Sequence, residues 1–280
     1  MRHGGPEDEK QLPSPHPYDP LTFWNGKATR AGGDPMRAVC HDDPAQNRCI
    51  DRVQRSVVNA AFDRIPGFHE GRGLRVLDYG CGSGRWAPFF LQHGCVYRGV
   101  DIAPAMVKLA KEHHPDTHFT VLGEKGIPFP PAEFDLVVSI ATIHHNPREE
   151  QDRILDELIR VLKPSGHLLL FESVGDPDPS NPIEYARPRL DWDRSMGERG
   201  LAPLWYRGVR YFILCSAVRR MGCLFRRTAS PPPKACPGWI LAADALLDPI
   251  LGPLLPERYH QRAGMLFRKS GPTADSDGGT

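Results

Sequence analysis

Three glycines at alternate positions, Gly80, Gly82 and Gly84, form the stretch of this chain with the clearest chemical meaning. They follow a strand-like run, Leu74–Leu77, that ends in Asp78, and they precede a segment that can be helical. Glycines where a strand hands over to a helix permit a tight turn and let a ligand approach the backbone closely. The arrangement predicts a site for a nucleotide-like ligand.

A second acid narrows the identity of that ligand. Seventeen residues beyond Gly84, the strand-like run Tyr97–Val100 ends at Asp101, where a carboxylate suits the two hydroxyls of a ribose. The turn reads G-x-G-x-G, whereas dinucleotide sites usually read G-x-G-x-x-G. Asp78 would repel a pyrophosphate but can pair with an ammonium group. S-adenosylmethionine (SAM), with a ribose at one end and an amino acid at the other, fits both acids.

Here the chain resembles the class I SAM-dependent methyltransferases, in particular the small ubiquinone-biosynthesis-like (methyltransferase type 11) subfamily. Phe134–Ser139 resembles the fourth-strand motif of the family, and Leu162–His167 resembles its turn before strand five. The resemblance is continuous over Gly73–Ser173. It implies an α/β fold: a doubly wound, seven-stranded, mostly parallel Rossmann-like sheet with an N-terminal helical cap. The chain itself adds a helical insertion between the last two strands.

The resemblance also implies a set of residues around SAM. Asp78 and the backbone of Gly80 and Gly82 would hold the methionine end, and Asp101 the ribose. The other residues expected there are Gly84, Met106, Gly123 and Trp24, with Ile102 on the adenine, Ser139 and Ile140 facing the sulfonium, and Glu124 where the family usually places an aspartate near the adenine amino group.

Two adjacent histidines are the candidate catalytic residues. His144 and His145 follow the fourth strand at the carboxyl edge of the sheet, where ligands bind in open α/β folds. An imidazole titrates near neutrality and can remove a proton from a methyl acceptor. Glu172, at the end of strand five, reaches the same edge and can orient one imidazole. The alternative is that one histidine only hydrogen-bonds the local backbone.

Composition favours an ordinary cytoplasmic protein. The net charge is +1, and no run of 18 uncharged apolar residues occurs. The seven cysteines are scattered without C-x-x-C spacing, so neither a disulfide framework nor a metal site is expected. The expected division of the chain is a disordered tail at 1–17, a cap segment at 18–70, the methyltransferase domain at 71–269 with an insertion at 231–259, and a second disordered tail at 270–280.

The hydrophobic pattern predicts alternating strands and helices. The expected helices are Trp86–Gln92, Ala103–His113, Arg148–Leu162 and Gly208–Met221. The later strands are His118–Leu122, Phe134–Ile140 and His167–Phe171, with Leu224–Arg227 and Met265–Lys269 as the two strands that close the sheet.

The last third of the chain bears on partners. The apolar stretch 239–255 is interrupted by acids and prolines and so cannot span a bilayer; it predicts a lid, a homodimer face or a peripheral membrane contact. Arginines concentrate between 187 and 227, a local basic face that suits an anionic partner, with solvated surface charge as the alternative.

The leading functional hypothesis is methyl transfer from SAM to an oxygen, nitrogen or carbon of a small molecule. A second is a transfer-RNA methyltransferase, because Ser139–His145 resembles enzymes that complete wobble-uridine side chains; without an RNA-binding module it is disfavoured. A third is a SAM-binding partner protein without catalysis. Nothing in the chain predicts DNA binding.

Overall fold

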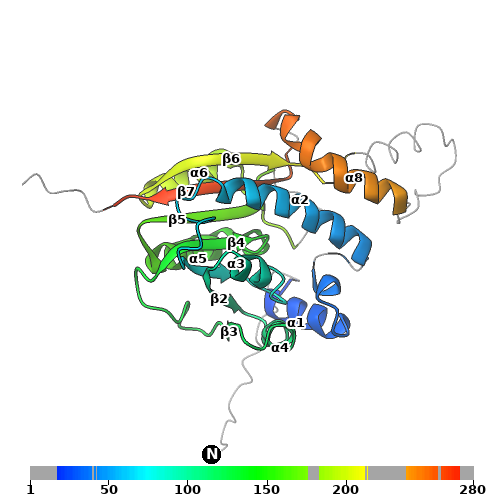
Figure 1. Cartoon of the computed structure of the whole chain (residues 1–280), viewed down its shortest axis with the longest axis horizontal. Helices are drawn as coiled ribbons and strands as arrows, with labels where there is room; N and C mark the ends of the chain where they lie inside the picture. The colour runs from blue at the N-terminus through cyan, green and yellow to red at the C-terminus, as the bar shows by residue number, and fades with distance from the viewer. Residues whose placement is uncertain are drawn as a thin grey trace, which may run out of the picture.

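A seven-stranded sheet forms the centre of the protein (Figure 1). The computed structural model describes residues 18–39, 41, 43–175, 183–211, 213, 238–257 and 260–271. The strand order is β3-β2-β1-β4-β5-β7-β6. The strands are β1 Arg75–Tyr79, β2 Val96–Asp101, β3 His118–Val121, β4 Phe134–Ile140, β5 Leu162–Ser173, β6 Leu201–Val209 and β7 Arg262–Lys269. Strands β1 to β5 pair in parallel and β7 is antiparallel to both neighbours, which confirms the predicted mostly parallel sheet.

Helices cover both faces of the sheet. Successive residues of a buried strand point to opposite faces, so Leu136 and Val138 join one core cluster while Val137 joins the other. Helix α2 contributes to the first cluster and α5 to the second. The helices are α1 Pro20–Arg30, α2 Pro44–Phe62, α3 Ala87–Gln92, α4 Pro104–His113, α5 Arg148–Val161, α6 Arg189–Glu198 and α8 Gly238–Leu251, with short 3₁₀ turns η1 Pro35–Ala38, η2 Ile143–His145 and η3 Gly252–Leu254.

Helix α2 illustrates how local sequence sets these elements. Asp43 caps its first turn by accepting a hydrogen bond from the Ala45 N–H, and Pro44 occupies the first turn, where a proline costs no hydrogen bond. Val53, Val57 and further apolar residues at helical spacing are buried against the sheet. The expected N-terminal helical cap is thus built from α1, η1 and α2.

The strand at the edge of the sheet is not the one predicted from the sequence. The edge strand is β6, whereas Leu224–Arg227 lies outside the described residues. The helix predicted to begin at Gly208 is wrong at its start, because Gly208 and Val209 belong to β6; residues 212 and 214–221 also lie outside the described part. Strand β5 begins directly after α5, at Leu162, where it pairs with Phe134 before a register shift. The predicted tail 1–17 lies outside the described residues, and so does the predicted tail 270–280 except for Ser270 and Gly271.

Helix α8 and η3 form the helical insertion expected between the last two strands. In Figure 1, α8 lies beside α2, and the two helices pack together. Within the described residues, no helix is long and apolar enough to cross a membrane.

Candidate active site

A cavity opens at the carboxyl edge of the parallel strands. Its empty space, counted together with the open mouth, is about 1290 Å³. Its walls come from the ends of β1, β2 and β4, from the cap helices, and from the start of β7. Segments distant in sequence therefore meet around one space, as expected for an open α/β sheet.

The glycine turn lies along the floor of this cavity. Gly80 has φ +73° and Gly82 φ +53°, in the left-handed region that favours glycine. A Cβ on Gly80 would come within 2.2 Å of the Thr142 side chain, so β1 and the loop after β4 approach closely only because Gly80 has none. A Cβ on Gly82 would meet no protein atom within 4 Å, and this leaves its backbone open to a ligand.

Asp78 is a buried carboxylate that faces the cavity. It is 1% exposed and accepts a hydrogen bond from the Tyr97 hydroxyl at 2.7 Å. Burial raises its pKa to about 6, against the opposing hydrogen bond of Tyr97. Among the described residues, no lysine or arginine forms an ion pair with it. An ammonium group in the cavity would supply that missing charge, so the site fits the amino-acid end of SAM.

Asp101 anchors the other end of the turn. One carboxylate oxygen accepts from the Gly82 N–H and the other from the Ala103 N–H, both at 2.9 Å. Burial raises its pKa, while these backbone bonds lower it. Each oxygen keeps a second lone pair that can accept from a ribose hydroxyl. Ile102 and Met106 line the same end of the cavity, and this suits an adenine.

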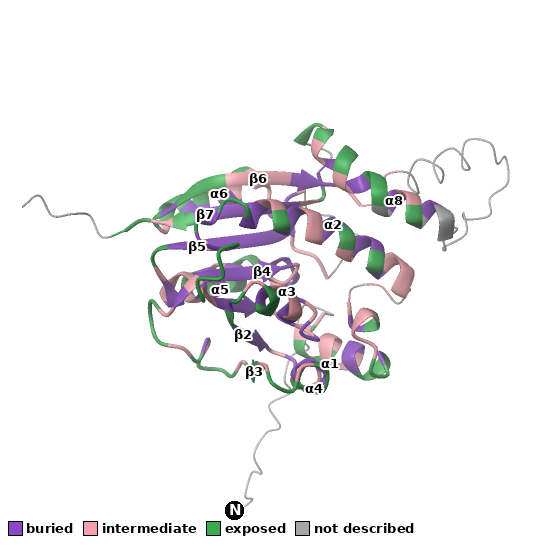
Figure 2. Cartoon of the chain, in the orientation of Figure 1, coloured by how far each residue is buried: buried purple, intermediate pink, exposed green. Residues whose placement is uncertain are grey.

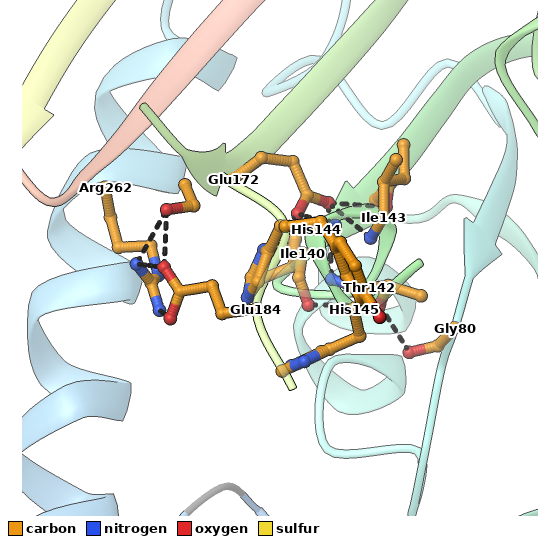
Figure 3. A network of polar contacts seen from close by, with 12 residues as sticks. Gly80, Ile140, Thr142, Ile143, His144, His145, Glu172, Glu184 and Arg262 are labelled. Atoms are coloured by element: carbon orange, nitrogen blue, oxygen red, sulfur yellow. Dashed lines mark hydrogen bonds and ion pairs between the residues drawn. The ribbon is translucent and has the colours of Figure 1, made fainter. Parts of the chain in front are cut away.

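Glu172 is the centre of a hydrogen-bond network at the end of β4 (Figure 3). The carboxylate is fully buried and accepts from the Ser139 hydroxyl at 2.9 Å and from the backbone N–H groups of Thr142, Ile143 and His144 at 3.1–3.3 Å. It also accepts from Nδ1 of His144 at 2.5 Å. Glu172 therefore fixes both the path of η2 and the position of the His144 ring.

This contact sets the chemistry of His144. A hydrogen on Nδ1 bonded to a carboxylate leaves Nε2 of a neutral imidazole as the hydrogen-bond acceptor. His144 lines the cavity, and its Nε2 forms no hydrogen bond with any of the described residues. In this arrangement Nε2 of His144 can accept a hydrogen bond from a ligand in the cavity, while Glu172 holds the ring in place.

His145 has a different environment. Its Nδ1 lies 2.7 Å from the Ile183 carbonyl, and its ring meets Trp24 edge-on at a centroid distance of 5.3 Å. Burial, and then the neighbouring His144, lower its pKa to about 3. His145 is therefore neutral near pH 7 and a weak base. It is better suited to shaping the wall than to taking a proton.

The cavity brings together most of the predicted site residues but not all of them. Those that line it are Trp24, Asp78, Gly80, Gly82, Asp101, Ile102, Met106, Ile140, His144 and His145. Ser139 and Glu172 lie behind the wall, where they bond each other. Gly123 and Glu124 are exposed outside it, and Leu122 lines the cavity there instead. Gly84 supports packing, because a Cβ on it would lie 2.8 Å from the Phe119 ring.

Sequence reasoning missed several residues of the site. Tyr97 is the hydrogen-bond partner of Asp78, and a tyrosine inside a buried strand was the available signal, since a buried hydroxyl needs a partner. Gln54, Tyr211 and Arg262 line the cavity from three distant parts of the chain. Arg262 pairs with Glu184 and hydrogen-bonds the Ser173 hydroxyl, contacts that no local pattern indicates.

Comparison with known proteins finds methyltransferases. Residues 77–170 match the family described as "Methyltransferase domain". The chain is 34% identical over 127 residues to the phthiotriol/phenolphthiotriol dimycocerosates methyltransferase of Mycobacterium leprae (strain TN), which covers 42% of this chain and 45% of that one. It is 26% identical over 175 residues to the fatty-acid O-methyltransferase of Mycolicibacterium smegmatis, and this match covers 60% of the chain and 58% of the relative. It is 29% identical over 137 residues to the probable 18S rRNA (guanine-N(7))-methyltransferase of Dictyostelium discoideum, a match that covers 45% of the chain and 47% of the relative.

The fold is shared more widely than the sequence. Magnesium protoporphyrin IX methyltransferase from Synechocystis PCC 6803, solved with bound SAH, superposes with a TM-score of 0.58 at 14% identity and covers 89% of this chain and 98% of that one. Residues 77–170 are therefore a methyltransferase domain of the class I, SAM-dependent type, as the sequence predicts. The chain spans about half the length of the curated relatives it matches.

Proposed function

We propose that the protein transfers a methyl group from SAM to an oxygen, nitrogen or carbon of a small molecule. One observation carries the proposal: a single cavity is lined by the buried acids Asp78 and Asp101 and by the imidazole of His144, which Glu172 orients. Asp78 and Asp101 suit the two ends of SAM, and His144 suits the methyl acceptor. When bound, SAM supplies a methyl group already activated by its sulfonium.

The chain's own residues would then bind, orient and deprotonate. Ionised Asp78 pairs with the ammonium group, and Asp101 accepts from the ribose hydroxyls. Trp24 and Ile140 line the cavity and help to keep water from it. Nε2 of His144 accepts the proton of an acceptor hydroxyl or amine, while Glu172 stabilises the resulting imidazolium.

The cavity lining also includes apolar side chains and two arginines, Arg85 and Arg262. Ile50 and Tyr211 are among the apolar ones, and the guanidinium of Arg262 is held by Glu184 at 2.7 and 2.9 Å. Donors held in this way suit an oxygen of a largely apolar acceptor. Two of the matched relatives are named for fatty-acid or dimycocerosate substrates, and this supports a lipid-like acceptor.

RNA is the weaker alternative. The rRNA methyltransferase relative favours it, but the basic face expected from the sequence is partly neutralised. Arg187 is buried and pairs with Asp152, and Arg199 pairs with Asp156. Phosphate binding needs free cations. Co-purification with RNA that is lost steeply as the salt concentration rises would favour this alternative.

Calorimetry with SAM tests the cofactor site. We expect Asp101→Ala to weaken binding by about ten- to a hundredfold, since hydrogen bonds to a charged group are lost. Lys111→Ala, on the outer face of α4, is the control and should leave binding unchanged. If the wild-type protein does not bind SAM, or if Asp101→Ala binds equally well, the proposal is wrong.

Transfer itself is tested with methyl-labelled SAM and fractions of small molecules, lipids and RNA. We expect label in a small-molecule or lipid fraction and its loss in His144→Gln. Binding of SAM with no labelled product in any fraction would support the alternative hypothesis of a SAM-binding partner protein without catalysis.

A further inference from the structure

Helix α8 has the reverse of the polarity expected at a protein surface. Its only two charged side chains, Asp244 and Asp248, are 0% exposed. Apolar side chains face outward instead, and they are 38–75% exposed; this α8 stripe consists of Leu246, Leu247, Ile250 and Leu251, with Leu254 of η3. A surface helix ordinarily turns its apolar side inward. The outward side of α8 is therefore suited to something less polar than water.

Inward polar contacts fix this orientation. Asp244 and Asp248 are one helical turn apart and so lie on one side of α8. An oxygen of Asp248 accepts from the backbone N–H of Ile213 at 3.1 Å. Rotating α8 to bury the stripe would break this contact, so the apolar exposure is built into the packing.

The stripe adjoins the helix that forms one wall of the cavity. Helix α8 packs on α2, and Ile50 and Gln54 of α2 line the cavity. The two helices run side by side in Figure 1, and Figure 2 shows exposed residues alternating with buried ones along α8. A surface that bound the stripe would lie near the helix α2, which lines the cavity.

Two exposed cations lie on α2, the helix against which α8 packs. Arg48 and Arg52 are exposed, lie one turn apart, and form no hydrogen bond or ion pair with any described residue. Cys49 lies between them and is close enough to Asp244 and Asp248 for their charges to raise its pKa, after burial. Cations and an apolar stripe on adjacent helices match the headgroup and acyl layers of an anionic bilayer.

We infer that the α8 stripe docks the protein on the surface of an anionic lipid bilayer. The stripe has five apolar side chains over ~13 Å of helix, which is few beside the ~20–30 residues with which each partner of a stable dimer buries ~800 Å². In a bilayer the side chains of the stripe need only reach the boundary between headgroups and acyl chains. Docking requires neither SAM nor methyl transfer, so its test is independent of the proposed activity.

Vesicle flotation with the full chain tests this inference. We expect binding to phosphatidylcholine vesicles that contain phosphatidylserine and weak binding to phosphatidylcholine alone. Ile250→Gln with Leu254→Gln should lower the partition constant about tenfold or more, because two apolar side chains leave the lipid. The matched control is Leu91→Gln with Leu190→Gln, two comparably exposed residues on α3 and α6, which should bind as wild type.

The arginines are tested in the same assay. Arg48→Gln with Arg52→Gln should weaken binding to the anionic vesicles, roughly fivefold for each arginine at low salt, and Lys111→Gln with Lys125→Gln should not. Three outcomes would overturn the inference: no vesicle binding by the wild type, equal loss in the leucine control, or a dimer in solution that Ile250→Gln with Leu254→Gln dissociates.

Discussion

Replacing Glu172 by glutamine tests the link between the hydrogen-bond network and the proposed chemistry. The two side chains have the same shape, but the amide presents an NH₂ group where the carboxylate has an acceptor oxygen. One oxygen of Glu172 accepts from Ser139, Thr142 and Ile143, and the other from the backbone and ring of His144. The NH₂ group opposes fewer donors on the His144 side, so we expect it there.

The imidazole can adapt only by changing its tautomer. Nδ1 of His144 would accept from the new amide, and Nε2 would carry the hydrogen and lose its capacity to act as a base. We expect kcat to fall about 10²–10⁴-fold for an acceptor that must lose a proton. The backbone N–H of His144 also loses its acceptor, so the free energy of unfolding should fall by about 2–4 kcal/mol, which leaves a folded protein.

Nitrogen-15 NMR of the histidine ring reads the tautomer without knowledge of the acceptor. We expect the hydrogen on Nδ1 of His144 in the wild type and on Nε2 in Glu172→Gln. Ser139→Ala is the matched control, since it removes one hydrogen bond from the same carboxylate, should cost about 1–2 kcal/mol, and should keep the wild-type tautomer. The reasoning is refuted if folded Glu172→Gln keeps the hydrogen on Nδ1.

Three further predictions concern the cofactor side. Burial raises the pKa of Asp78 to about 6, and only the ionised carboxylate pairs with an ammonium group. SAM affinity measured by calorimetry should therefore fall about tenfold for each pH unit below 6, and Asp78→Asn should remove this pH dependence. Tyr97→Phe removes a hydrogen bond that stabilises the ionised form, so the midpoint should move about 1–2 pH units higher; an unchanged midpoint would contradict the assigned contact. Gly80→Ala should lower the melting temperature more than Gly82→Ala, because only the first Cβ collides with Thr142, while both should impair SAM binding; equal melting temperatures would count against the close approach.

The sequence by itself determined the strand and turn framework of the cofactor side. Strands β1, β2 and β4 are short buried runs, and the glycines and Asp101 follow such strands directly, so their positions depend on local chain geometry. The same holds for His144 and His145, which come directly after β4. Local pattern was therefore enough to place these side chains at one edge of the sheet.

Tertiary structure decided what depends on contacts between distant segments. Strand β6 pairs only with β7 at the edge of the sheet, and its residues 202–204 are exposed, so it lacks the apolar pattern that marks the inner strands. Packing likewise places Glu172 behind the cavity wall, where it accepts from His144, and brings Arg262 to the cavity. It also turns Asp244 and Asp248 inward, so that the leucines of α8 face solvent. Each of these placements depends on a contact with a residue more than 25 positions away or with another element. A single sequence does not show which distant residues will come into contact.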